Sequence, residues 1–389
     1  MRLIAALAVL LFAVSGMSVA RAGDKEIAAI EAVLAPGPVD TTLFSADFLK
    51  AVPPAALEPV LARIKTTIGP VVAVEPRGGQ SYAVETATHE MLADIGLDGA
   101  GKIAGLLLHP PLARNASLAD LLEALGAVAP QSAYLITRDG ATLYSSEPDM
   151  ALAVGSAFKL GVLKALKDEI DAGTRRWSDV VVLSAADISF PSGFLQTWPV
   201  GSPLTLHTLA ALMISISDNT ATDTLMHLVG RDKVEAALGV APALTTRELF
   251  TLKADAGLKA RYVAADLSGK RTVLAEMATL PLPDITKVGT PHDQGAEWYI
   301  SPTKLCELIA AVAGLDVAQI NPGVANKSEW ASVSFKGGSE IGVLSLVTAL
   351  TAKDGAHYCV SAVWNGPQAI DEAKATTAYA SVLSKLAKG

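Results

Sequence analysis

The chain has 389 residues, of which 51% are hydrophobic and 18% are charged, so it has ample material for a core, and disorder of the whole chain is disfavoured. Lys and Arg total 31 against 39 Asp and Glu, with no basic run, which disfavours nucleic-acid binding. Two cysteines and six scattered histidines form no HxH or HExxH pattern and no cysteine-rich site, so we expect no metal and no other cofactor. The length predicts two domains, or one large and one small.

The first 22 residues have the features of a secretory signal peptide. Arg2 supplies a positive start, residues 3–14 form an apolar run, and residues 20–22 (Ala-Arg-Ala) match a cleavage site. The run is too short to span a membrane, and no later stretch reaches the ~18 apolar residues that a span requires. We therefore expect a periplasmic or secreted mature chain without a membrane span, an uncleaved anchor being the alternative.

Residues 24–112 predict a small α+β domain. Helical patterns cover residues 25–34 and 55–68. Four strand-like runs follow, with glycine-containing turns between them, over residues 71–74, 81–85, 91–95 and 103–108. Helices followed by an antiparallel meander predict a sheet packed against helices. This part has no reactive constellation, and Pro110-Pro111 begin a linker.

Residues 113–389 predict a second domain in which strands at both ends enclose a helical region. A helix over 118–125 precedes a hairpin whose turn is Asp139-Gly140. Helices broken by loops occupy about 156–312, strands return near 333–335, 342–348 and 357–363, and a helix covers 370–386. Such an order predicts one antiparallel sheet with a helical subdomain beside it and a cleft between the two. The sequence alone cannot show whether Cys306 and Cys359 pair, and we expect two buried free thiols.

The first motif is residues 156–159 (Ser-Ala-Phe-Lys), which places Ser156 and Lys159 on one helix face. A serine hydroxyl needs a base to act as a nucleophile, and a lysine deprotonated by burial supplies one. About one chance copy of SxxK is expected in a chain of this length. A second copy, residues 301–304, reads as a helix start with Ser301 as its N-cap.

The second motif is Ser217-Asp218-Asn219, which lies between an apolar run and a predicted helix. Ser217 can relay a proton towards a leaving group and Asn219 can hold an amide of the substrate, while Asp218 braces the loop through backbone hydrogen bonds. Taken alone, such a tripeptide is more often an ordinary helix cap.

The third motif is residues 336–339 (Lys-Gly-Gly-Ser) on a predicted strand after Phe335. Glycines within a strand mark a bulge or the close approach of another group, here an extended substrate. The backbone N–H of Ser339 would pair with that of Ser156 as an oxyanion hole. Taken alone, the motif reads as a hairpin turn. The expected substrate contacts are Asn219, Phe335, Gly337, Gly338 and Ser339.

In order and spacing, the three motifs resemble those of class A β-lactamases and penicillin-binding proteins. Residues 204–208 and 218–223 extend the resemblance. It implies an antiparallel sheet flanked by helices, plus an all-helical subdomain. It also implies a nucleophile, a proton acceptor, a proton shuttle and an electrostatic partner, which are Ser156, Lys159, Ser217 and Lys336 respectively. Residues 192–201 would form one rim of the cleft. Residues 24–112 resemble a steroid-isomerase-like domain, also called nuclear-transport-factor-2-like, of the cystatin-like α+β class.

The chain departs from class A sequences in the loop that follows the second motif. Class A members carry Glu-x-x-Leu-Asn there, with a glutamate that activates the deacylating water, and this chain has no such motif. Glu248 and Glu297 are the candidate replacements, although a salt-bridging or structural role is favoured for each. Gly337 stands where a hydroxyl of Ser or Thr usually binds carboxylate, and no arginine follows it.

We therefore expect an exported serine hydrolase that is acylated at Ser156 by β-lactams or related amides and esters. Deacylation should be slow because a missing general base commonly costs ~10²–10⁴-fold. One alternative is a DD-peptidase or esterase acting on cell-wall peptides or small esters through the same residues. The other is a non-catalytic ligand-binding or sensor protein. The expected partner is a small-molecule substrate, and the sequence makes no prediction of the oligomeric state.

Overall fold

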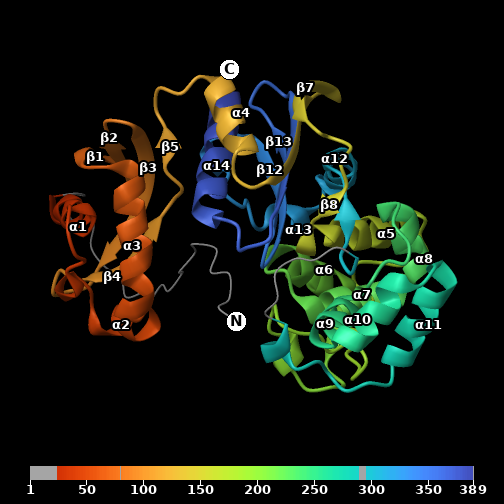
Figure 1. Cartoon of the computed structure of the whole chain (residues 1–389). Helices are drawn as coiled ribbons and strands as arrows, with labels where there is room; N and C mark the ends of the chain where they lie inside the picture. The colour runs from red at the N-terminus through yellow and green to blue at the C-terminus, as the bar shows by residue number, and fades with distance from the viewer. Residues whose placement is uncertain (1–23, 79, 289–294, 389) are drawn as a thin grey trace. The chain divides into compact units, whose positions relative to one another are not determined.

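The computed structural model describes residues 24–78, 80–288 and 295–388, which divide into two compact units (Figure 1). One unit contains Glu123–Ala375, and the other contains the described residues up to Leu122 together with Thr376–Lys388. The front unit thus runs past the expected boundary at residue 112, to Leu122, and it also takes most of the last helix. The predicted signal peptide lies outside the described residues.

The front unit is a helix-on-sheet sandwich. Its helices are α1 (Asp24–Leu34), α2 (Ala46–Ala51) and α3 (Pro54–Ile68). Its strands are β1 (Val71–Gly78), β2 (Ser81–Thr86), β3 (His89–Leu97), β4 (Ile103–Leu108) and β5 (Leu112–Ala113). The antiparallel order is β1-β2-β3-β4, with β5 paired to β3. A core of its own, including Ile30, Leu61 and Val84, holds the helices on the sheet. The predicted helices and meander are confirmed.

The larger unit contains one antiparallel sheet assembled from both ends of its sequence. Its strands are β6 (Gln131–Arg138), β7 (Ala141–Ser146), β12 (Ser332–Glu340), β13 (Val343–Thr351) and β14 (His357–Asn365). Their order is β12-β13-β14-β6-β7. Asp139 and Gly140 both have positive φ, the conformation that a two-residue hairpin turn needs. The predicted hairpin and the sheet built from distant segments are therefore confirmed.

The chain between β7 and β12 is mainly helices joined by loops, as the sequence predicts. They are α5 (Lys159–Asp171), α6 (Leu206–Ser215), α7 (Asn219–Val229), α8 (Arg231–Leu238), α9 (Thr246–Ala254), α10 (Ala256–Ala264), α11 (Leu267–Met277), α12 (Pro302–Val312) and α13 (Asp316–Gln319). Short strand pairs join this region, namely β8 (Leu152–Ala153) with β11 (Tyr299–Ile300) and β9 (Val180–Val182) with β10 (Pro203–Thr205). Helix α4 (Leu118–Gly126) precedes the sheet, and α14 (Glu372–Lys388) follows it.

Ser301 caps α12 by accepting from the Lys304 N–H, and Pro302 is the first helical residue, so the second SxxK copy is structural as predicted.

Cys306 and Cys359 form a disulfide, with their Cα atoms 5.8 Å apart, and the expectation of two free thiols is wrong. Helix α12 packs against β14, and this packing brings together two residues that are far apart in sequence. Spacing along a chain cannot reveal such a pairing.

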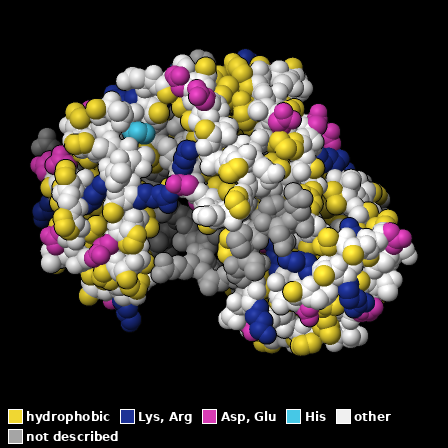
Figure 2. Space-filling model, viewed as in Figure 1, with side chains coloured by type: hydrophobic (Ala, Val, Ile, Leu, Met, Phe, Trp, Pro, Cys, Tyr) yellow, Lys and Arg dark blue, Asp and Glu magenta, His cyan; other side chains and the backbone are white. Residues whose placement is uncertain are grey.

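Among the described residues, no helix combines the length and the apolar character needed to cross a bilayer. Figure 2 shows acidic and basic side chains interspersed with apolar ones on the visible face of each unit.

Candidate active site

Ser156 lies in a short 3-10 turn, η2 (Gly155–Phe158), directly before α5. The turn is fixed by its apolar neighbours, since the buried Phe158 ring stacks on Trp298 at 3.8 Å and the Val154 N–H donates to the Trp298 carbonyl. Ser156 itself is half-buried, and the described residues offer its hydroxyl no hydrogen bond. The local structure therefore anchors the backbone of this serine and leaves its oxygen available.

Lys159 is the first residue of α5, and it is completely buried. Its Nζ donates to three oxygens: the Ser217 carbonyl at 2.7 Å, Ser217 Oγ at 3.0 Å and Asn219 Oδ1 at 2.7 Å. Burial, followed by the nearby charge of Lys336, lowers the pKa of Lys159 well below its ordinary value. The structure therefore favours a neutral amine one helical turn after Ser156.

Lys336 projects from β12, and its Nζ donates to Ser217 Oγ at 3.1 Å and to the Gly337 carbonyl. Burial lowers its pKa to about 7. The hydroxyl of Ser217 thus lies between two buried amines that come from α5 and from the sheet. Ser217 has φ +60°, an uncommon backbone conformation for a residue with a side chain, and such strain is concentrated at functional sites.

Asp218 braces this loop, as the sequence predicts. It caps α7 by accepting from the Ala221 N–H, and its other oxygen accepts from the N–H groups of Phe194 and Leu195. A Cβ on Gly193 would lie 2.1 Å from the Asp218 carboxylate, so only glycine allows this approach. The predicted rim, residues 192–201, is therefore tied to the second motif at its beginning.

Asn219 is buried, and both ends of its carboxamide are used inside the protein. Its Oδ1 accepts from Lys159 and from Ser192 Oγ, and its Nδ2 donates to the Phe190 carbonyl at 2.8 Å. In this structure Asn219 holds Lys159 in place, whereas the sequence suggested a direct contact with substrate.

The third motif places backbone against backbone. A Cβ on Gly338 would lie 2.1 Å from the Val154 carbonyl oxygen and 2.5 Å from the Ser156 nitrogen. Likewise, a Cβ on Gly155 would lie 3.1 Å from the Ser339 nitrogen. The glycine at position 338 thus allows β12 to touch the turn that carries Ser156. It brings together the segments that hold the two expected oxyanion-hole N–H groups.

Side chains at odd positions of β12 project from its opposite face, because side chains alternate along a strand. The Phe335 ring contacts Gly337 and Gly323, and Ser339 Oγ donates to Glu372 Oε1 at 3.0 Å. The side chains of Phe335 and Ser339 therefore point away from the strand face on which Lys336 binds Ser217. Of the expected contacts on this strand, Gly338 and the backbone of Ser339 are the ones placed beside Ser156.

The two candidate replacement glutamates both lie in ion pairs. Glu248 completes a capping box with Thr245 and binds Arg231 through both oxygens, at 2.6 and 3.0 Å. Glu297 has a fully buried side chain that pairs with Lys253. The structure thus gives both residues structural surroundings.

Lys253 also pairs with Glu340 at the end of β12. Burial alone lowers the pKa of Lys253, but Glu340 and Glu297 outweigh this effect and raise it. The sequence analysis missed this cluster because Lys253 and Glu340 are isolated charges on elements 87 positions apart. No local signal could have paired them.

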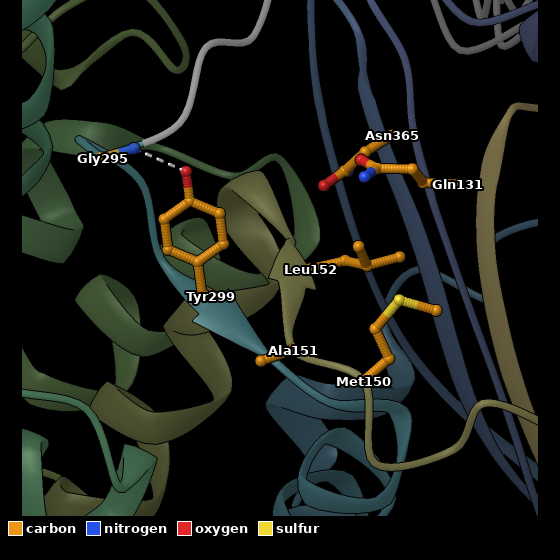
Figure 3. Close-up of a pocket in the computed structure, with 7 residues that line it drawn as sticks. All are labelled: Gln131, Met150, Ala151, Leu152, Gly295, Tyr299 and Asn365. Carbon is orange, nitrogen blue, oxygen red and sulfur yellow. Dashed lines mark hydrogen bonds between the residues drawn. The ribbon is translucent and has the colours of Figure 1, made fainter.

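A cavity of about 380 Å³ lies next to β8, the strand that precedes the turn with Ser156 (Figure 3). Its lining consists of Gln131, Met150, Ala151, Leu152, Gly295, Tyr299 and Asn365. The Asn365 carboxamide holds β8 by bonding both the N–H and the carbonyl of Ala153. None of the expected site residues lines this cavity. Within the described ranges, no group of three or more His, Cys, Asp or Glu side chains is placed to hold a metal ion.

Residues 114–387 match the beta-lactamase enzyme family, a span of more than two thirds of the chain. The chain belongs to this family. The match begins after residue 112, so the nuclear-transport-factor-2-like character of residues 24–112 stays a prediction. No curated protein sequence matches the chain.

Solved structures of beta-lactamase-like proteins are similar to this family member. A beta-lactamase from Sphaerobacter thermophilus has 22% sequence identity and a TM-score of 0.50. The similarity covers 69% of this chain and 94% of the Sphaerobacter chain. A structure of PBP-A has 16% identity and a TM-score of 0.47, covering 72% and 98%. A beta-lactamase from Chitinophaga pinensis has 16% identity and a TM-score of 0.47, covering 69% and 97%. The first similarity supports the predicted sheet-plus-helices fold.

Proposed function

We propose that this member of the beta-lactamase family is an exported serine hydrolase that forms an acyl-enzyme at Ser156 with β-lactams or related amides and esters. The observation that carries the proposal is the bonding of Ser217 Oγ to the Nζ atoms of both Lys159 and Lys336. A binding protein has no need of a lysine with a depressed pKa beside a serine, whereas acyl transfer needs one.

In the proposed acylation, neutral Lys159 accepts the proton of Ser156 as Oγ attacks the carbonyl carbon of the substrate. The backbone N–H groups of Ser156 and Ser339 stabilise the oxyanion, and removal of one such donor typically costs about 10²–10³-fold in rate. The C–N or C–O bond then breaks. Ser217 delivers a proton to the leaving atom and is reprotonated from Lys159. The charge of Lys336 supports both Ser217 and an anionic group of the substrate.

Deacylation lacks the glutamate loop of class A enzymes, and we propose that this step is slow. The surroundings of the two candidate replacements support this view. Glu248 is engaged with Arg231 and a helix cap, and Glu297 has no contact with solvent. Glu248 would first have to leave both Arg231 and its helix cap, and the Glu297 side chain is closed to water.

Intact-mass measurement after incubation with a penicillin tests the proposal. Wild-type protein should gain one acyl adduct that persists over many minutes, and Ser156→Ala should gain none. Ser301→Ala is the matched control, because it removes the serine of the second SxxK copy and should label like wild type. No adduct on wild type would overturn the acylation proposal, and rapid turnover of a chromogenic cephalosporin would overturn slow deacylation.

Gly337 favours a second candidate, an esterase or DD-peptidase that uses the same residues. Without a hydroxyl at this position, the site has fewer donors for the carboxylate that penicillins carry. Release of alcohol from a neutral ester, or of D-alanine from a D-Ala-D-Ala peptide, faster than β-lactam acylation would support this candidate.

A further inference from the structure

The end of β12 places Glu340 on the same side of the strand as the catalytic groups. Side chains two residues apart share a strand face, so Glu340 follows Lys336 and Gly338 on one face. Lys336 binds Ser217 from this face, and Gly338 touches the backbone of Ser156 on it. Glu340 is thus the next side chain past the turn that carries the nucleophile.

Three carboxylates act on Lys159 and raise its pKa against the stronger effects of burial and Lys336, namely Asp223, Asp218 and Glu340. Two of them are fully buried and committed to backbone groups. Asp218 accepts from the N–H groups of residues 194, 195 and 221, and Asp223 accepts from those of residues 246 and 247. Glu340 differs because 14% of its side chain is exposed, so that solvent reaches it.

Lys253 fixes the position of Glu340. This lysine lies at the end of α9, only 8% of its side chain is exposed, and it pairs with Glu340 on one side and with Glu297 on the other. The raised pKa of Lys253 keeps it charged at neutral pH, so it can hold Glu340 through their ion pair. Glu297 is closed to solvent, which leaves Glu340 as the member of this cluster that water can approach.

We propose that Glu340 activates the water that deacylates Ser156, with Lys253 as the residue that positions it. This inference rests on the proposed acyl-enzyme function. Glu340 takes a proton from water as the water oxygen bonds to the acyl carbon. The bond from that carbon to Ser156 Oγ then breaks, the serine oxygen recovers the proton, and a carboxylic acid leaves.

The same ion pair explains why the step is slow. A carboxylate bonded to a buried ammonium group is a weaker base than a carboxylate in water, because protonation would break the pair. We therefore expect deacylation through Glu340 to be slower than with an unpaired general base and faster than with no base.

The experiment compares full-length wild type, Glu340→Gln, Glu340→Asp and Glu297→Gln by intact mass after a pulse of penicillin and its removal. Both glutamine variants leave Lys253 with one carboxylate, so Glu297→Gln controls for the lost charge and packing. We expect Glu340→Gln to acylate at the wild-type rate and to lose its adduct at least about tenfold more slowly. Glu297→Gln should lose its adduct at a rate within about twofold of wild type. Glu340→Asp keeps the charge on a shorter side chain, so its rate of adduct loss should fall between those of wild type and Glu340→Gln.

The outcomes separate the two proposals. No adduct on wild type removes the acyl-enzyme function itself. An adduct on wild type that never decays, or one whose decay is unchanged by Glu340→Gln, overturns the role of Glu340 alone. Equal slowing by Glu297→Gln and Glu340→Gln shows that the cluster is only structural and also overturns it. If Glu340→Gln does not fold, as judged by circular dichroism, Glu340→Asp decides by the same comparison.

Discussion

At the scale of single residues, the site contains two lysines whose pKa values are lowered by burial. Lys159 and Lys336 lie on either side of one hydroxyl, and the charge of Lys336 lowers the pKa of Lys159. Two ammonium groups close together in a buried site repel each other, so the arrangement favours at most one charge. In the proposed mechanism, the pair has opposite roles, in which Lys159 accepts a proton and Lys336 carries the charge.

Replacing Lys336 tests this division of duties. The acylation rate of wild type should rise with pH as Lys159 loses its proton and fall as pH passes about 7, where Lys336 loses its charge. In Lys336→Met the rising limb should move to higher pH, because the neighbouring positive charge is gone, and the falling limb should vanish. Acylation rates measured between about pH 5 and 9 check both limbs.

Lys164→Met is the control, since Lys164 lies on α5 but pairs with Asp168 at the surface. It should leave both limbs in place. A rising limb that moves to lower pH in Lys336→Met would contradict the assigned roles.

The sequence predicts the contacts of some site residues and not those of others. An Asp directly before a helix is a capping signal, so the bracing role of Asp218 follows from local rules. The structural role of Asn219 does not follow from local rules, because its contacts with Lys159 and the Phe190 carbonyl form only when the chain folds. The Lys253 cluster cannot be predicted either, because an ion pair between a helix and a strand has no signal in the local sequence of either element.

At the scale of elements, one close approach joins the rim to the second motif. Gly193 and Gly201 occupy the same rim segment with nearly equal φ, +93° and +96°. A Cβ on Gly193 would meet Asp218, whereas a Cβ on Gly201 would meet nothing within 4 Å. The two glycines thus separate the cost of backbone strain from the cost of a steric clash.

Gly201→Ala should cost about 1–2 kcal/mol of folding free energy, because a left-handed backbone disfavours a Cβ. Gly193→Ala should cost more, about 2–4 kcal/mol, and should slow acylation as well, because Asp218 must move. Urea denaturation and the acylation rate measure the two effects. Equal losses in the two variants would mean that the contact with Asp218 is unimportant.

Elements with strong local signals are predicted well, and elements that depend on distant partners are not. The turn at Asp139-Gly140 and the helix start at Ser301 are encoded within a few residues. The strands β8 and β11 have two residues each and exist because Ala153 pairs with Tyr299. Periodicity cannot reveal so short a strand, although this pair aligns the segment that leads to Ser156.

At the scale of the whole molecule, the disulfide ties the helical region to the central sheet. It closes a segment with a sequence separation of 53, which the chain-entropy relation converts to about 4 kcal/mol of stabilisation. The double variant Cys306→Ala, Cys359→Ala should therefore lose about 2–4 kcal/mol in urea denaturation and still acylate, because neither sulfur is near Ser156 in the described contacts.

Adding dithiothreitol should lower the free energy of unfolding of wild type and leave that of the double variant unchanged. A stability that is insensitive to reductant in wild type would show that the bond contributes nothing.

The front unit is built from both ends of the chain, which has a consequence for the order in which the protein is completed. The Ala113 N–H donates to Ser381 Oγ, and Lys388 pairs with Glu90, so the last helix supplies part of the unit whose strands are made first. During synthesis, the strands of this unit emerge from the ribosome before residues 123–375 and before helix α14, so the unit can be completed only after the larger one has been made.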